Sequence, residues 1–121
     1  MTQLDVLTDL FGRLSTIPEV TAIYDSIAPN GAESPYIVIS SVNTYDGRLM
    51  NNTEKRLSIT LNIWSSYKGK KEVNTISNKI YQVLETDYDL VSEQYLIDPV
   101  SNWSRAILNY EYFYQSDGRD K

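Results

Sequence analysis

The chain has 121 residues, a formal net charge of −5, and neither cysteine nor histidine. These counts exclude a zinc finger, a thiol nucleophile, an imidazole base and a histidine metal site, so only carboxylates, hydroxyls, lysine and tyrosine remain for catalytic chemistry. The acidic balance also argues against a nucleic-acid binder, because lysine and arginine supply most of the affinity for phosphates.

The size and composition predict one folded domain over residues 1–121. Hydrophobic residues make up 41% of the chain, which suffices for a core without disulfide or metal staples. No apolar run approaches the roughly 20 residues of a membrane span. The segment Met1-Thr2-Gln3 lacks the basic and apolar regions of a signal peptide. We therefore expect a protein that is made and kept in a cytoplasm, without membrane contact.

The first predicted element is an amphipathic helix that ends before Pro18. Thr2 followed by Asp5 three positions later is a helix N-cap pattern. Hydrophobic residues then recur at helical spacing. Residues 20–24 form a short apolar stretch, which we expect to be an edge strand. The predicted hydrophobic stripe of the helix consists of Leu4, Leu7, Leu10, Phe11 and Leu14.

A loop and a buried strand follow. Proline, glycine, asparagine and serine gather between residues 29 and 35, and these residue types favour turns. Residues 36–40 are a β-branched and aromatic run, typical of a strand that is buried on much of both faces. The polar stretch continues beyond the turn pair Asp46-Gly47, so we expect a protruding hairpin loop over residues 45–52.

Residues 55–64 are the clearest strand of the chain. Hydrophobic and polar residues alternate with the period of two that a strand requires. One face therefore meets a core, and the other meets water or another subunit. The apolar face carries Leu57, Ile59, Leu61 and Ile63, and the polar face carries Arg56, Ser58, Thr60 and Asn62.

A second amphipathic helix and two strands complete the predicted order. The helix follows residues 68–70 and ends near Asp87, a short strand lies around residues 95–97, and the last strand covers residues 103–114. This order predicts an α+β fold: an antiparallel or mixed β-sheet of about four to five strands with two helices packed on one face. The helix presents Val73, Ile76, Ile80, Val83 and Leu84; the last strand presents Ala106, Leu108, Tyr110, Tyr112 and Tyr114 on one face and Arg105, Asn109 and Glu111 on the other.

No group of residues has the spacing of a catalytic, metal or nucleotide site. Asp87 and Asp89 lack the rest of a calcium loop and are interpreted as a solvated helix end. The five glycines are too far apart for a phosphate loop, and the serines lack a histidine base. The lysines at 68, 70 and 71 are interpreted as a solvated turn, with contact to an acidic partner or to DNA as the alternative. We expect no enzyme activity, no cofactor and no metal.

Tyrosine is unusually common, with 10 residues in the chain. Tyr110, Tyr112 and Tyr114 share one face of the last strand, which suits a half-buried sheet face or a subunit contact. Stacking of single-stranded nucleic acid would need neighbouring basic residues, and Asn109 and Glu111 stand there instead. The tyrosine stripe is therefore interpreted as core or interface.

The residues that point to a function are those of a protein interface. Leu49 and Met50 lie at the tip of the polar loop 45–52, where apolar side chains are costly unless another surface or their own domain covers them. Trp64 lies on the polar face of strand 55–64, where it either anchors an interface or, if the strand twists at its end, packs under the second helix. The predicted interface consists of Tyr45, Arg48, Leu49, Met50, Arg56, Trp64 and Tyr67.

The order of several segments across nearly the whole chain carries a family resemblance. The segments are AIYD at 22–25, SPYIVI at 34–39 and KRLSITLNIW at 55–64, followed by a helix and a closing strand with Arg105 near its start. In this order and spacing they resemble the tail-completion proteins of long-tailed bacteriophages, also described as tail-terminator or head-to-tail joining proteins.

The resemblance implies a small α+β protomer that assembles into a ring, expected to be a hexamer, at the head–tail junction of a virion. The ring closes the head-proximal end of the tail tube and joins it to a head connector or head-completion protein, after assembly in the host cytoplasm. DNA passes through without specific binding, for which an acidic chain is suited. The resemblance brings no catalytic residues. The high tyrosine content and net acidity depart from many relatives and leave the channel lining open.

A second interpretation rests on the residues alone. A small cytoplasmic adaptor or inhibitor, without catalytic activity, would hold one partner protein on its tyrosine-rich sheet. An adaptor stays small until its partner is added, whereas a ring builder associates with its own copies.

Overall fold

The computed structural model describes residues 2–25, 27–46, 54–67 and 69–115. Within these ranges, no helix has both the length and the apolar composition needed to cross a membrane. The elements are α1 (Gln3–Leu14), β1 (Ala22–Tyr24), β2 (Tyr36–Asp46), β3 (Glu54–Ser65), α2 (Lys71–Leu84), β4 (Asp89–Ile97) and β5 (Ser104–Gln115).

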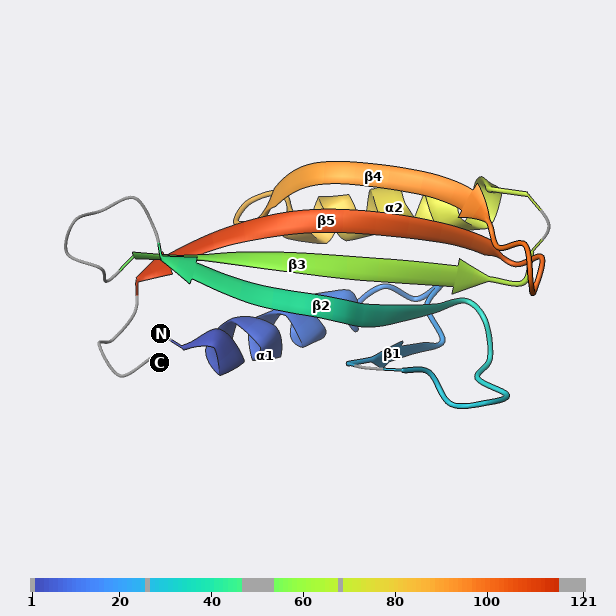
Figure 1. The fold of residues 1–121 in the computed structure, drawn as a ribbon, viewed down its shortest axis with the longest axis horizontal. Helices are drawn as coiled ribbons and strands as arrows, with labels where there is room; N and C mark the ends of the chain where they lie inside the picture. Colours follow the sequence, from blue (N-terminus) through green and yellow to red (C-terminus); the bar gives the residue numbers. More distant parts are fainter. Residues whose placement is uncertain (1, 26, 47–53, 68, 116–121) are drawn as a thin grey trace.

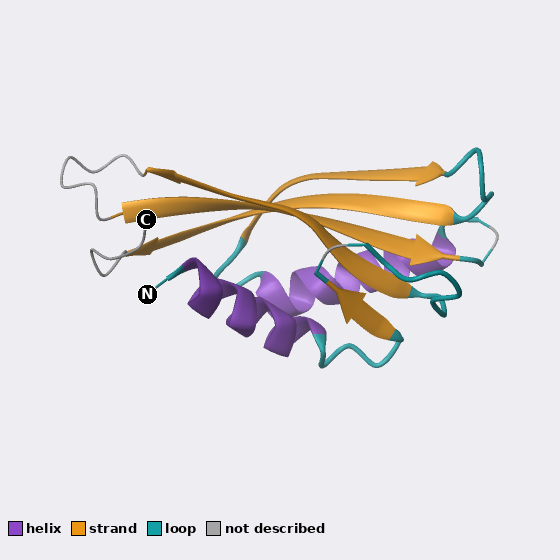
Figure 2. Ribbon diagram, turned by 60° about the horizontal axis from the view of Figure 1, so that its bottom comes forward, coloured by secondary structure: helices purple, strands orange, loops and turns teal. Residues whose placement is uncertain are grey.

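The strands form one mixed sheet in the order β1-β2-β3-β5-β4. β1 pairs parallel with β2, and the other neighbours are antiparallel. Both helices lie on the same side of the sheet, as Figures 1 and 2 show, with α2 against β3, β4 and β5 and α1 against α2. The α+β fold predicted from the order of elements is confirmed.

Helix α1 begins at the predicted cap. The Thr2 hydroxyl accepts a hydrogen bond from the Asp5 backbone N–H at 3.2 Å, and the Thr2 N–H donates to the Asp5 carboxylate at 2.9 Å. These reciprocal bonds satisfy backbone donors that a helix start leaves without partners. The buried stripe is Val6, Leu10 and Leu14, and Leu4 is 71% exposed. Including Leu4 in the hydrophobic stripe was therefore wrong. Val6, Leu10 and Leu14 are spaced four positions apart and define the face that meets the core, and Leu4 lies off that face.

Two strands are longer than the sequence predicted. β2 continues from Tyr36 to Asp46, with an irregularity in its pairing between Ile39 and Ser41. β4 covers nine residues instead of the short stretch around 95–97, because it pairs along β5 even where both of its sides are exposed. Tyr45 consequently belongs to β2 rather than to a loop.

The core lies between the sheet and the two helices. The predicted apolar face of β3 is confirmed, since each of its four side chains is 0% exposed. Tyr110 and Tyr114 are buried on the same side, and Tyr112 packs against Tyr88 with ring centroids 4.6 Å apart. The tyrosine stripe is thus core. Helix α2 buries Val73, Ile76, Ile80 and Leu84 as predicted, with Val83 partly buried at the edge.

Arg13 fastens α1 to the turn between α2 and β4. Its Nε lies 3.0 Å from the Asp9 carboxylate, and its Nη1 donates to the Val83 carbonyl at 3.2 Å. Its Nη2 pairs with Asp87, and this hydrogen bond is the largest contribution that raises the pKa of Arg13. The Tyr88 hydroxyl donates to Asp9 at 3.0 Å. Asp87 is exposed, as expected for a solvated helix end, but it is ion-paired.

Replacing Arg13 with alanine is expected to lower the free energy of unfolding by about 1 kcal/mol. The change removes the side-chain hydrogen bond to the Val83 carbonyl and two partly exposed ion pairs. Lys79→Ala is the matched control, since Lys79 makes one exposed pair with Glu19 at 3.3 Å and should cost at most about 0.5 kcal/mol. Urea unfolding measures both; equal losses would show that the Arg13 cluster adds nothing beyond surface charge.

Candidate interaction face

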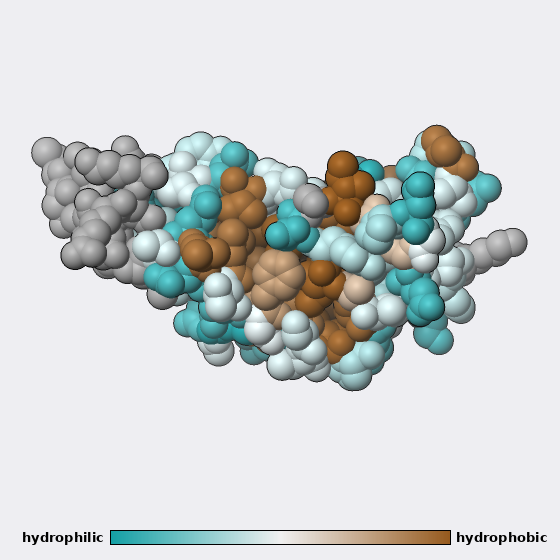
Figure 3. Space-filling model, turned by 90° about the horizontal axis from the view of Figure 1, so that it is seen from below, coloured by the Kyte–Doolittle hydropathy of each residue, from teal (hydrophilic) through white to brown (hydrophobic). Residues whose placement is uncertain are grey.

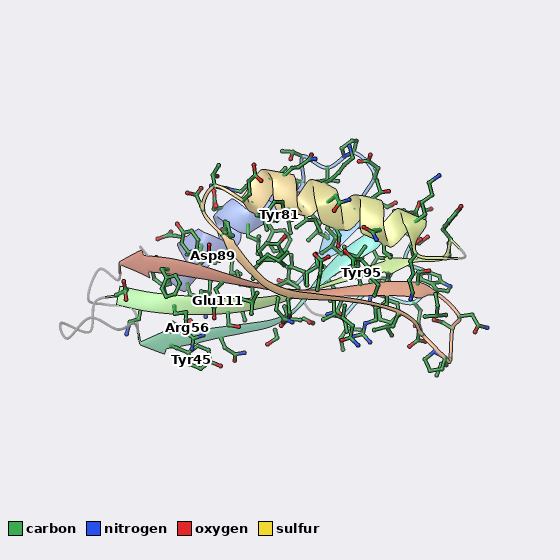
Figure 4. All side chains as sticks on the ribbon, turned by 90° about the horizontal axis from the view of Figure 1, so that it is seen from above. Tyr45, Arg56, Tyr81, Asp89, Tyr95 and Glu111 are labelled. Carbon is green, nitrogen blue, oxygen red and sulfur yellow. The ribbon has the colours of Figure 1, made fainter. Side chains whose placement is uncertain are left out.

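No helix of the described residues covers the sheet face opposite α1 and α2, and we call it the open face. Figure 4 shows Tyr45 and Arg56 on this side of the sheet, whereas Tyr81 and Tyr95 lie toward α2. Its side chains alternate with the core residues along each strand. It contains Tyr36, Val38, Ser40, Asn43 and Tyr45 of β2; Arg56, Ser58, Thr60, Asn62 and Trp64 of β3; Arg105, Ile107, Asn109, Glu111 and Phe113 of β5; and Asp89, Ser92, Gln94 and Leu96 of β4.

One end of the open face holds a compensated cation. The Arg56 guanidinium lies 4.4 Å from the centre of the Tyr45 ring, and its Nη1 lies 2.6 Å from the Glu111 carboxylate. The structure thus brings together two predicted interface residues, Tyr45 and Arg56. Glu111 already balances the charge of Arg56 within the protomer, so this end of the face offers an aromatic surface more than a charged one.

The middle of the open face is a hydroxyl and amide row. The Thr60 hydroxyl donates to the Asn109 side chain at 2.8 Å, and the Asn109 amide donates to the Ser92 hydroxyl at 2.8 Å. These bonds cross from β3 through β5 to β4. They leave the middle of the face polar and uncharged.

The other end of the open face carries Arg105 and Trp64. The Arg105 guanidinium lies 4.8 Å from the centre of the Trp64 ring, and its Nε donates to the Asn62 side-chain oxygen at 2.9 Å. Asn62 in turn donates to the Ser40 hydroxyl at 2.6 Å and is only 3% exposed. A pocket of about 280 Å³ opens here, rimmed by Ile27 and Ala28 of the loop after β1.

This geometry decides between the two predicted positions of Trp64. The indole lies on the open face beside Arg105 and lines its pocket, so it does not tuck under α2. That alternative was wrong because the strand keeps its alternation to its last residues, pairing Trp64 with Arg105 across β3 and β5. A role of Trp64 at an interface stays a prediction.

The remaining predicted interface residues lie elsewhere. Tyr67 is 51% exposed after β3 and lines a separate pocket of about 230 Å³ with Lys71 and Glu72 of α2. Arg48, Leu49 and Met50 lie outside the described residues. The structure therefore brings only some of the predicted residues onto one face.

The two edges of the sheet differ in character. On the β1 side, a hollow of about 260 Å³ lies between α1 and β1, lined mainly by apolar side chains such as Phe11, Val20 and Ile23. Figure 3 shows apolar side chains gathered on this side of the molecule. On the other side, β4 exposes 57% of Val91 between the exposed carboxylates of Asp89 and Glu93. In the described sheet, no further strand pairs with the outer edge of β1 or of β4, so either edge can receive another protein.

The described residues contain no group of three or more carboxylate side chains placed to hold a metal ion. The alternation of the strands placed Asn62 and Arg105 on polar faces and indicated no further role for either residue. Their contact requires the register between β3 and β5, since they lie 43 positions apart. The signal available was a tryptophan and an arginine on polar faces of two neighbouring strands.

Comparison with known proteins identifies the family. A solved chain described as "Virion of native gene transfer agent (GTA) particle" is similar in fold, with a TM-score of 0.65 and 12% identity over 88% of this chain and 92% of that chain. The gp17 protein of bacteriophage SPP1 is also similar, with a TM-score of 0.60 and 13% identity over 90% and 88%. No curated protein matches. A family model described as "Tail completion protein gp17" matches residues 8–115, and the chain therefore belongs to the tail completion protein gp17 family.

Proposed function

We propose that this chain, a structural tail protein, forms a ring that closes the head-proximal end of a phage tail tube and joins the tail to the head connector. The observation that carries the proposal is the family match over residues 8–115, which covers most of α1 and every later element to the end of β5. Similarity in fold to a chain of a gene transfer agent particle and to SPP1 gp17 supports it. The two open edges and the open face supply separate surfaces for neighbouring copies, the tail tube protein and the head connector or a head-completion protein.

The ring is proposed to consist of identical copies, with the hexamer that the resemblance implies. Each copy acts as one domain over residues 1–121, without catalytic activity. DNA passes through without specific binding, since the net charge of −5 repels its phosphates. The ring assembles in the host cytoplasm and works at the head–tail junction of the virion.

Electron microscopy of particles made with and without this protein tests the proposal. Without it, we expect heads and tails that fail to join, and tails whose head-proximal end is not closed. Adding the purified protein to such tails should restore complete particles. Complete virions in its absence would refute the joining role, and a soluble complex with one non-virion protein would favour the adaptor.

A double change at residues 49 and 50, between β2 and β3 in the sequence, is expected to weaken assembly. Replacing Leu49 and Met50 with serine should leave folding intact but raise the protein concentration needed to complete tails about tenfold, because an interface would lose apolar contacts. The residues lie outside the described part of the chain, so the prediction rests on the sequence. Asn51→Ser with Asn52→Ser is the matched control. Unchanged assembly of the first variant would show that these two residues are not part of the interface.

A further inference from the structure

We infer that the Arg105 pocket of one copy receives a carboxylate from the β4 edge of the next copy, Asp89 or Glu93. The inference rests on the proposed ring, and it names a contact that holds neighbouring copies together. Three features carry it: a pocket, a guanidinium whose terminal nitrogens have no recorded partner in the described part of the chain, and an acidic strand on the opposite edge of the sheet.

The pocket is built from three strands and a loop. Tyr36 and Val38 of β2, with Trp64 of β3, give it apolar walls, and Ile27 and Ala28 form the rim. A volume of about 280 Å³ exceeds that of a carboxylate group and leaves room for the side chain that carries it. Ser40 and Asn62 also line the pocket, so its walls are part apolar and part polar. A charge contact beside apolar walls is stronger than one on a fully exposed surface.

Arg105 is held ready for a partner. Its Nε donates to Asn62, which is 3% exposed, and its guanidinium carbon lies over the Trp64 ring, 4.8 Å from the ring centre. Among the described residues, no hydrogen bond or ion pair reaches its two terminal nitrogens. These nitrogens form a planar fork that matches the two oxygens of a carboxylate. Because the side chain is already positioned, little of its rotational freedom is lost when a carboxylate binds.

Within residues 2–25, 27–46, 54–67 and 69–115, no carboxylate is recorded in this role. The Asp98 side chain accepts two hydrogen bonds from Ser101, each of 2.9 Å, and these bonds are the main cause that lowers the pKa of Asp98. Arg105 contributes to that lowering only through its charge at a distance. Arg56, on the same face, already has Glu111. Arg105 is thus the open-face arginine without an ion pair among the described residues.

The β4 edge has the complementary chemistry. Asp89 and Glu93 are exposed, and the described residues place no cation in ion-pair distance of either; Glu93 only accepts a hydrogen bond from Tyr95 at 3.3 Å. Copies in a ring meet head to tail, so two different surfaces face each other. The pocket extends from the loop after β1 across β2 and β3 to Arg105 of β5, and β4 is the edge strand opposite β1.

Charge exchange tests the contact on tails that lack the protein. Arg105→Gln and Arg105→Glu should each raise the concentration needed for half-maximal tail completion at least tenfold, while the urea midpoint of Arg105→Gln stays close to that of the parent. Asp89→Lys or Glu93→Lys should do the same. Combining Arg105→Glu with the lysine variant of the correct acid should restore completion to within threefold of the parent.

Lys79→Gln is the matched control, because it removes one cation from α2 and should leave completion unchanged. Parent-like completion by both Arg105 variants would overturn the contact while leaving the ring intact. Loss that neither lysine variant restores would overturn β4 as the source of the carboxylate. Failure of the parent protein itself to complete tails would instead refute the proposed function and the contact with it.

Discussion

Replacing Trp64 with alanine is expected to weaken tail joining by about 2 kcal/mol or more, roughly 30-fold, while the protomer keeps most of its stability. The indole is partly exposed on the open face, where it forms one wall of the pocket and supports Arg105 at 4.8 Å. Its removal would deprive an interface of the apolar indole surface and would leave the Arg105 guanidinium without the ring beneath it. Within the protomer it costs chiefly the cation–π contact, about 0.5–1 kcal/mol at a site of this exposure.

Stability and assembly must be measured on the same preparation. Urea unfolding gives the first, and the concentration for half-maximal tail completion gives the second. Trp64→Phe is the matched control, because a phenyl ring keeps an aromatic surface under Arg105 and should lose less assembly than alanine. A drop in unfolding free energy of about 3–5 kcal/mol for Trp64→Ala would instead show that the indole is part of the packed interior.

Above about pH 10, the protein is expected to lose stability at up to about 1.4 kcal/mol per pH unit for each of two buried tyrosines, Tyr88 and Tyr110. They are 2% and 1% exposed, and burial raises the pKa of both well above the ordinary tyrosine value. For Tyr88, the hydrogen bond to Asp9 raises the pKa further. Below the ordinary value both states hold the proton. Above it the unfolded chain releases the proton and the folded chain keeps it, so rising pH favours unfolding until the folded-state pKa is reached.

Urea unfolding between about pH 8 and pH 11 measures this loss. Tyr110→Phe should reduce the slope above about pH 10 by about half, because it removes one of the two groups while keeping the ring in the core. At neutral pH, Tyr88→Phe should cost about 1 kcal/mol through its bond to Asp9. A stability that stays constant with rising pH would show that these hydroxyls reach water in the folded state.

Much of the fold follows from local patterns. The alternation along β3 and the helical spacing of α2 predicted their buried faces. On a regular strand or helix, the position in the repeat decides whether a side chain faces the core or the outside. The cap of α1 was equally predictable, since Thr2 and Asp5 interact within one turn. Family resemblance predicted the structural role in a phage tail.

The parts that were missed depend on contacts between distant residues. β4 carries Ser92, Glu93 and Gln94 in a row, and an edge strand with exposed sides has no alternation to show. The pairing irregularity near Ser41 changes which residues of β2 face the core, so Val42 rather than Ser41 is opposite Ile59. The Arg105 pocket requires strand register, which the sequence of either strand alone does not contain.

The pairing of β3 with β5 has a consequence for how the chain folds. β2 with β3, and β4 with β5, are antiparallel neighbours in the chain, and such hairpins form within about 1–10 μs. The seam between them joins residues such as Leu61 and Leu108, which are far apart in sequence, and closing so long a loop is slow. During synthesis, one edge of β3 therefore stays unpaired until β5 has been translated and has left the ribosome. In a cell that is making many copies at once, this interval is when chains are most prone to pair with one another.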